Sequence, residues 1–540
     1  MKSGRWRACL LAGLSLAAGR AVFAQQMPDA SASTSAASAS VAGGGAASAG
    51  IDAAAPPSGA ALRQRGWDFK PSIGIDLTQT DNVFLQAKDP SSDLIVKTSP
   101  GLLLQGQSAR ASAYVDLQLQ QINYMNNGDR DRLQHAFNGT GKIEVLENWL
   151  YLDLSGRISR QATSVFAPPT SGSDSINNNV VEARSYRVSP YIKGRAFGAA
   201  DYMLRFDNTQ YSSKNGPMRD TTVQSVQGNL AGASPLMRLG WSLDGATQQV
   251  DYSSGAQNKT DSLRGNLTYT FDPQFRFTVI HGQESNDYVN FQQQTSNING
   301  WGFEWAPNER TQLAWKQEHR YFGQGHDLRL TYRTPHTAWR ISDSRDVAVL
   351  APQTMTYSVG TYFELLDEQF KSAYPDDAER AAIVLAYLQS LNLSPDAQVI
   401  GGFMSSRASI NRRREISFTW TGVRNVITMS AQESNRTALG TGADIPIDDF
   451  SLSSTIRQRG INFNWAHKLT PNATLTFVGG RAQVTGNTSN LDTDRTTYSL
   501  NLSRKLGVYT SATIGVRKSK VSGYLDYDEN AVIASLIAKF

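Results

Sequence analysis

Apolar and polar side chains alternate at every second residue along most of the chain from Trp67 onward. Alternate side chains of a β-strand leave opposite faces of the sheet. This period therefore predicts strands that each have one apolar face and one polar face. The alternation is clearest in the segments 113–120, 150–158, 202–207, 275–279, 416–420 and 461–465. We predict an all-β structure over residues 66–540.

Short turn signals separate these strands and indicate which kind of all-β fold they form. Longer polar stretches, such as 161–182 and 284–297, lie between the short turns. A soluble sandwich shows the same alternation, but short connections at one end and long ones at the other are typical of outer-membrane barrels. The turns predict a transmembrane antiparallel outer membrane β-barrel of about 22 strands, in a range of about 18 to 24. The ten short turn signals are 107–108, 147–148, 197–198, 234–235, 272–273, 307–308, 335–336, 423–425, 471–472 and 506–507.

Residues 1–24 have the three-part pattern of a secretory signal peptide. A basic start precedes the apolar run 8–19, and the small residue Ala24 ends the segment. The run is too short for the ~20 residues that a membrane-spanning helix needs. The segment holds four basic and no acidic residues, so its removal lowers the formal net charge from +5 to +1. Nothing in the remaining charge favours a nucleic-acid partner.

Residues 25–65 are rich in Ala, Ser, Gly and Pro and contain almost no large apolar side chain. Such a segment cannot bury enough surface to offset the entropy lost on ordering. We predict a disordered periplasmic linker. A small partner-binding segment is the alternative interpretation.

Tryptophan placement and the end of the chain agree with a barrel. Trp rings suit a membrane interface, because they combine an apolar body with one N–H donor. The last residues alternate and end on Phe540, which resembles the C-terminal strand that the barrel-insertion machinery recognises. We expect that machinery to be a partner. Five Trp near short turns predict a periplasmic aromatic girdle: Trp149, Trp305, Trp339, Trp420 and Trp465. Four others fit it less tightly: Trp67, Trp241, Trp301 and Trp315.

The segment 346–406 breaks the strand pattern. Ile383, Tyr387 and Leu391 recur at helical spacing, which predicts a small helical loop insertion. Irregular backbone exposed to lipid would leave its polar groups unpaired, so the insert must lie outside the bilayer or in the lumen. Two interpretations stay open, a plug or cap of the pore and a surface helical hairpin.

Three motifs follow this insert: Gly-Gly-Phe-Met-Ser-Ser-Arg at 401–407, an Arg-rich strand start at 410–415, and an aromatic stretch ending in Gly-Val-Arg-Asn at 418–425. Together with the Leu-rich helical segment, they resemble the large outer-membrane barrels associated with the exosortase/PEP-CTERM system. The resemblance implies the cell outer membrane of a Gram-negative bacterium and an exopolysaccharide setting. It implies no catalytic residues.

Candidate chemistry is sparse. The six His show no metal-site spacing, and the chain has no nucleophile elbow or phosphate loop. We therefore predict no enzyme activity, no cofactor and no metal. A rim hydrolase using His281, Ser285 and Asp287 is the alternative.

The polar strand faces carry the remaining information. Their mixed charges and many amides suit hydrated, hydroxyl-rich solutes better than a single ion. The candidate lumen-lining residues are Tyr114, Asp116, Gln118, Tyr151, Asp153, Arg157, Arg205, Lys316, Glu318, Arg320, Asn462, Asn464 and Arg517. Arg412, Arg413 and Arg414 are candidates for a positive rim or for anchors to lipopolysaccharide phosphates.

The predicted function is a porin-like barrel for export or passage of extracellular polysaccharide. The alternative is a structural or docking barrel without an open pore. The predicted partners are outer-membrane lipid and lipopolysaccharide, polysaccharide or periplasmic export proteins, and no nucleic acid.

Overall fold

The computed structural model describes residues 66–167, 175–176, 178–213, 220–233, 238–253, 257–287, 293–348, 407–439, 448–487, 491–524 and 526–540. Within these ranges, no helix is both long and apolar enough to cross a membrane. The signal segment 1–24 and the linker 25–65 lie outside the described residues, as does the insert from 349 to 406. These three assignments stay predictions.

The described chain forms one antiparallel sheet of 22 strands, with little helix beside it. A 3-10 turn, η1 (Gly128–Arg130), and a short helix, α4 (Asp449–Leu452), lie in connections. The strands are β1 (Gly66–Thr80), β2 (Asp93–Gln107), β3 (Ala111–Tyr124), β4 (Arg132–Leu146), β5 (Leu150–Ala162), β6 (Val180–Ala196), β7 (Ala200–Ser213), β8 (Thr221–Ala233), β9 (Leu239–Tyr252), β10 (Gln257–Asp272), β11 (Phe275–Asn286), β12 (Gln294–Asn308), β13 (Thr311–Arg320), β14 (Gly323–Arg333), β15 (Thr337–Ala348), β16 (Ser409–Thr421), β17 (Asn425–Ala438), β18 (Thr455–Thr470), β19 (Ala473–Thr485), β20 (Thr493–Lys505), β21 (Thr510–Gly523) and β22 (Tyr527–Lys539).

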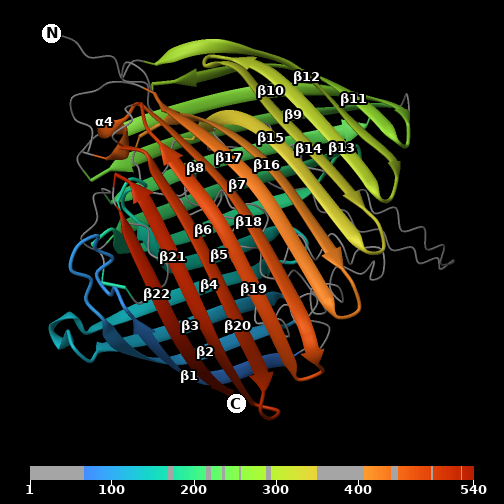
Figure 1. The fold of residues 1–540 in the computed structure, drawn as a ribbon. Helices are drawn as coiled ribbons and strands as arrows, with labels where there is room; N and C mark the ends of the chain where they lie inside the picture. Colours follow the sequence, from blue (N-terminus) through green and yellow to red (C-terminus); the bar gives the residue numbers. More distant parts are fainter. Residues whose placement is uncertain are drawn as a thin grey trace, which may run out of the picture. The chain divides into compact units, whose positions relative to one another are not determined.

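The sheet closes on itself. Each strand pairs with the next along the chain, and β1 also pairs with β22, with Asp76 opposite Ser535. Figure 1 shows these first and last strands side by side. The Phe540 N–H donates to the Pro71 carbonyl at 2.9 Å, which ties the last residue to the first strand. The predicted antiparallel barrel of 22 strands is confirmed.

The two ends of the barrel have different connections. All ten predicted short turns fall at or beside the junctions of consecutive strands at one end, from β2–β3 to β20–β21. We call this the short-turn end and the opposite one the long-loop end. One long-loop connection is shorter than expected, since only residues 321 and 322 join β13 to β14. Strand β15 also continues through Ala348, so the first three residues assigned to the insert are paired strand instead.

Strand pairing assigns each side chain to the outer or inner face, because directly paired residues share a face. On β1, Ile73, Ile75 and Leu77 are more than 40% exposed, whereas Thr78 and Thr80, which follow them on the alternate positions, are buried. The pairs can be followed from β1 around all 22 strands. They assign Ala531 of β22 to the inner face, in agreement with its direct pairing to the inner-face residue Thr80 of β1. The outer face is therefore apolar and the inner face polar, as a membrane-spanning barrel requires.

Eight of the nine described Trp lie on the outer face by this register, and the ninth, Trp149, lies in the turn between β4 and β5. Eight of the nine lie within five residues of the short-turn end, and Trp301 lies seven residues away. These Trp form a ring around the short-turn end. Trp67 and Trp241 belong to it, although the turn signals in the sequence favour them less. The indole of Trp149 also donates to the Tyr202 hydroxyl at 3.0 Å on the outer surface. The ring marks the short-turn end as one membrane interface.

Candidate functional site

The thirteen predicted lumen-lining residues all lie on the inner face by register. They fall on six strands: three each on β3, β5 and β13, two on β18, and one each on β7 and β21. Tyr151, Glu318, Arg320 and Asn464 are buried, whereas the other nine keep partial or full exposure. The structure brings only some of them together, for example Asp153 and Arg205 at 3.1 Å.

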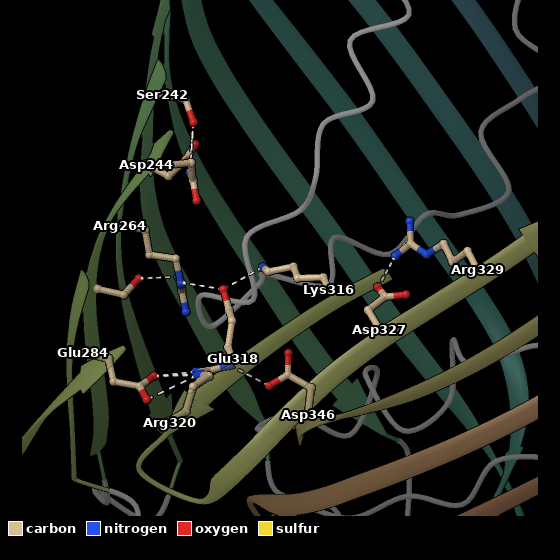
Figure 2. Close-up of polar contacts among 12 residues, drawn as sticks. Ser242, Asp244, Arg264, Glu284, Lys316, Glu318, Arg320, Asp327, Arg329 and Asp346 are labelled. Atoms are coloured by element: carbon tan, nitrogen blue, oxygen red, sulfur yellow. Dashed lines mark hydrogen bonds and ion pairs between the residues drawn. The ribbon is translucent and has the colours of Figure 1, made fainter. Parts of the chain in front are cut away.

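The most tightly connected group is an inner-face ion cluster, which we define as Arg264, Glu284, Lys316, Glu318, Arg320 and Asp346. Figure 2 shows these side chains converging from β10, β11, β13 and β15. Arg320 donates to both Glu284 oxygens, with Nη2 2.5 Å from Oε2, and its Nη1 lies 2.7 Å from Asp346. Lys316 Nζ lies 2.8 Å from Glu318 Oε1, and Arg264 Nε lies 3.6 Å from the same oxygen. Glu318 thus receives two cations, and Arg320 neutralises two carboxylates.

Glycines allow the longest of these contacts. Arg264 is on β10 and Glu318 is on β13, three strands away, a span of roughly 14 Å along the sheet. The inner-face residue paired with Arg264 on β11 is Gly282, and the one paired with Glu318 on β12 is Gly300. A Cβ at Gly300 would lie 2.5 Å from the Gln317 carbonyl oxygen, and one at Gly282 would clash with the Leu263 carbonyl. With no side chain directly beside either residue, the two long side chains can extend toward each other along the wall.

Sequence reasoning placed Lys316, Glu318 and Arg320 on this wall but missed Arg264, Glu284 and Asp346. The sequence does carry a signal for Arg264: Leu263 and Leu267 are apolar positions of one strand face, so the period of two assigns Arg264 to the opposite, polar face. Asp346 was assigned to the insert. The arginines and carboxylates of the cluster are between 1% and 6% exposed, apart from the half-exposed Asp346. Such a buried, charge-balanced group holds neighbouring strands together and offers no single-sign ring to select ions.

A second inner-face group, the basic–aromatic patch, lies near the short-turn end on β4 to β7. The Tyr151 and Tyr191 rings stack with centroids 5.1 Å apart. Lys193 Nζ lies 4.6 Å from the Tyr151 centroid, and the Arg205 guanidinium lies 5.2 Å from that of Tyr191. Lys142 is also 5.6 Å from Tyr151. Both lysines are exposed, so this patch presents cations to the lumen.

At the long-loop mouth the connection between β5 and β6 meets the connection between β17 and β18. We call the described residues of the former, 163–167, 175–176 and 178–179, the crossing loop. Phe166 packs with Phe450 of α4 and Ile456 of β18, and all three are buried. The Val165 N–H donates to Asp449 Oδ2 at 2.7 Å. The two connections that meet here are separated by ten strands in one direction around the barrel and twelve in the other. They therefore come from opposite walls.

The far part of the crossing loop is fixed to the wall formed by β2 to β4. The Ile176 N–H donates to the Val83 carbonyl at 2.9 Å, and Ile176 packs with Val83 and Ile122. Arg132 of β4 donates to the Ser175 carbonyl at 3.1 Å. Because the loop is attached to both walls, it narrows the mouth in this conformation.

The attachment at Asp449 predicts a pH dependence. Burial, with a contribution from neighbouring Asp448, raises the pKa of Asp449 to about 6. Arg407 faces this site through an ion pair with Asp448 at 3.1 Å. Because burial raises the pKa above that of an unfolded Asp, the docked position of Asp449 is fully stable below about pH 4. Ionisation of the buried carboxyl then destabilises that position, by up to about 3 kcal/mol, as the pH rises to about 6.

We therefore expect the open-channel fraction in planar bilayers to rise as the pH increases from 4 to 6.5, and to stay constant above that range. Asp449→Asn should remove this dependence, because the amide cannot ionise. The control Asp526→Asn changes an exposed carboxyl at the same end and should keep it. An unchanged pH profile in Asp449→Asn would show that another group is responsible.

The three candidate rim arginines do not form one group. They lie three to five residues from the long-loop end of β16, but Arg413 is on the inner face, 3.6 Å from Glu415. Arg412 and Arg414 are on the outer face, because strand parity separates neighbouring residues. Any rim role of the latter two is therefore directed at the membrane side.

The candidate rim hydrolase residues do not bond to one another. His281 and Ser285 are on the outer face, where His281 Nδ1 lies 2.8 Å from Asn299 and Ser285 accepts from Thr295. Asp287 accepts the Lys259 N–H. Among the described residues, no group of three or more His, Cys, Asp or Glu side chains could hold a metal ion.

No protein-family model and no curated protein matches the chain. Among solved structures, the siderophore receptor PirA from Acinetobacter baumannii is similar with a TM-score of 0.44 and 9% identity, over 88% of this chain and 80% of that one. OccK2 (OpdF) from Pseudomonas aeruginosa matches with a TM-score of 0.33 and 10% identity, over 88% of this chain and 98% of that one. At this distance the similarities say nothing about a solute. The porin-like barrel fold follows from the closed register of the chain's own strands.

Proposed function

We propose that this chain is an outer-membrane β-barrel that passes, or helps to export, an extracellular polysaccharide. The observation that carries the proposal is the composition of the inner face, where many opposite charges are paired and amides, hydroxyls and tyrosines are frequent. The closed sheet and the apolar outer face support a location in the outer membrane, the usual place of such barrels.

A channel selective for one ion type would be expected to carry a ring of one charge sign. Here the ion cluster and the Asp153–Arg205 pair neutralise inner-face charges locally. Amides such as Asn462 and Gln118 both donate and accept hydrogen bonds, which matches the hydroxyl groups of sugars. The resemblance of residues 385–425 to exosortase-associated barrels points to the same setting.

The basic–aromatic patch is the part of the inner face best suited to meet a polymer first. It lies near the short-turn end, and short turns are periplasmic in outer-membrane barrels. Exposed Lys142 and Lys193 can bind acidic or hydroxyl groups, while Tyr151 holds both lysines in place through cation–π contacts.

Deletion of the gene in its native host should reduce polysaccharide at the cell surface, and the wild-type gene should restore it. The variant Lys142→Gln with Lys193→Gln should restore it only in part, because the cationic side chains that meet the polymer are lost. The control Lys88→Gln with Lys259→Gln removes two exposed lysines at the long-loop end, away from the patch, and should restore it fully. Unchanged surface polysaccharide in the deletion strain would contradict the proposal.

The second candidate is a docking barrel without an open pore. It is favoured by the apolar contacts at the long-loop mouth: besides the crossing loop, Ala408 beside β16 packs with Tyr211, Val223 and Val250 of β7 to β9. This candidate predicts a barrel that does not conduct and that purifies with periplasmic or surface partners.

A further inference from the structure

The outer face carries an uneven distribution of charge at the long-loop end. We compared outward-facing charged side chains in the half of each described strand nearer the long loops. Seven adjacent strands, β15 to β21, hold eight cations and three carboxylates, whereas the other fifteen strands hold three cations and four carboxylates. The eight cations are Arg345, Arg412, Arg414, Arg457, Arg459, Arg481, Lys518 and Lys520, and the three carboxylates are Asp343, Glu433 and Asp494. We call these eleven residues the outer basic surface.

The centre of the outer basic surface is an ordered arginine cluster on β16 and β18. Glu433 of β17 lies between them: it accepts from Arg457 Nε at 2.5 Å and Arg459 Nε at 3.3 Å, and it lies 3.4 Å from Arg414 Nη1. Asp343 of β15 holds Arg412 at 3.0 Å and Arg414 at 3.5 Å. Two carboxylates thus position four guanidinium groups and leave two positive charges in excess.

These arginines are accessible. The side chains of Arg412, Arg414, Arg457 and Arg459 are 41% to 51% exposed. A guanidinium group has five N–H donors in a planar fork, so one or two contacts to a carboxylate leave donors for another acceptor. The geometry is suited to phosphate, which arginine binds through paired N–H donors.

The cluster lies at the border of the apolar band. The next outward residue toward the barrel middle is Ile416 after Arg414 and Ile461 after Arg459, which are 50% and 62% exposed. Lipid headgroups lie at such a border, where basic side chains meet membrane phosphates. At the long-loop end of an outer-membrane barrel, the lipid is that of the outer leaflet.

We propose that the outer basic surface binds the phosphate groups of the phosphorylated glycolipid of the outer leaflet, the lipid A part of lipopolysaccharide. Its excess of five positive charges complements two phosphates, and the apolar strip beside it receives the acyl chains. Binding on one side would give the barrel a fixed lipid contact over β15 to β21. This inference does not depend on what passes through the lumen.

The test is binding of bisphosphorylated lipid A to the purified full-length barrel in detergent. The variant Arg457→Gln with Arg459→Gln should weaken binding by about tenfold or more, since each basic residue near an anionic headgroup contributes to affinity. The matched control, Arg184→Gln with Lys259→Gln, removes two outer-face cations at the same end but on β6 and β10, and it should bind as the wild type does. Raising the ionic strength should weaken binding to the wild type.

Two further probes distinguish the ligand chemistry. Dephosphorylated lipid A should bind at least about tenfold more weakly than the bisphosphorylated form, because the arginines lose their acceptors. Phosphatidylglycerol, with a single phosphate, should also bind more weakly. The proposal would be overturned if dephosphorylated lipid A or phosphatidylglycerol bound as tightly as bisphosphorylated lipid A. It would also be overturned if the Arg457/Arg459 variant kept its affinity for bisphosphorylated lipid A while circular dichroism showed an intact barrel.

Discussion

Replacing Arg320 with Met should lower the free energy of unfolding of the barrel by about 3 to 5 kcal/mol, because it leaves buried carboxylates without their cation. Arg320 is 5% exposed and contacts Glu284, which is 1% exposed, as well as Asp346. Reversible denaturant unfolding of the barrel in detergent or lipid would measure the change.

Arg329→Met is the matched control. Arg329 is also an inner-face arginine paired with a carboxylate, Asp327, at 2.6 Å, but its side chain is 61% exposed. Exposed pairs contribute at most about 1 kcal/mol, so this variant should be nearly neutral. The double variant Arg320→Met with Glu284→Gln should be more stable than Arg320→Met alone, since one stranded charge is removed. Equal effects of the two single Arg variants would show that burial of the cluster does not matter.

Replacing Phe166 and Phe450 with Ala should release the crossing loop and raise the conductance several-fold. The two rings are 2% and 4% exposed and pack with each other and Ile456. Truncation of a buried Phe costs about 3 to 5 kcal/mol, which exceeds the contribution of the remaining Val165–Asp449 hydrogen bond. Single-channel recording would measure both the step size and the open fraction.

Phe271→Ala is the control for this variant, because Phe271 is 52% exposed on the outer face near the short-turn end. It should leave the conductance unchanged. If the Phe166/Phe450 variant conducts no better than the wild type, the crossing loop does not restrict the pore.

The strand number and the two faces could be predicted from the sequence because both depend on local pattern. Ten short turns require 22 strands when the first strand begins and the last strand ends on the short-turn side of the barrel. A period of two then assigns each side chain to the inner or the outer face. The same parity rule separates Arg413 from Arg412 and Arg414, so the split of this triplet was predictable once its strand was identified.

The contacts between distant strands could not be predicted. Arg264 reaches Glu318 past its paired neighbour Gly282 and past Gly300, the paired neighbour of Glu318, and this arrangement depends on the register of four strands. Val165 and Asp449 are 284 residues apart in the chain, and no local pattern indicates that their connections meet across the mouth. The four arginines at the centre of the outer basic surface, on β16 and β18, likewise gather only through the lateral pairing of β16 to β18.

The most direct test of the account is single-channel recording of the purified full-length protein in a planar bilayer, with an acidic oligosaccharide added on the short-turn side. We predict discrete conductance steps that the sugar interrupts, with larger steps or a higher open fraction in the Phe166/Phe450 variant. An absence of conductance in both the wild type and that variant, with the barrel correctly folded, would contradict the account.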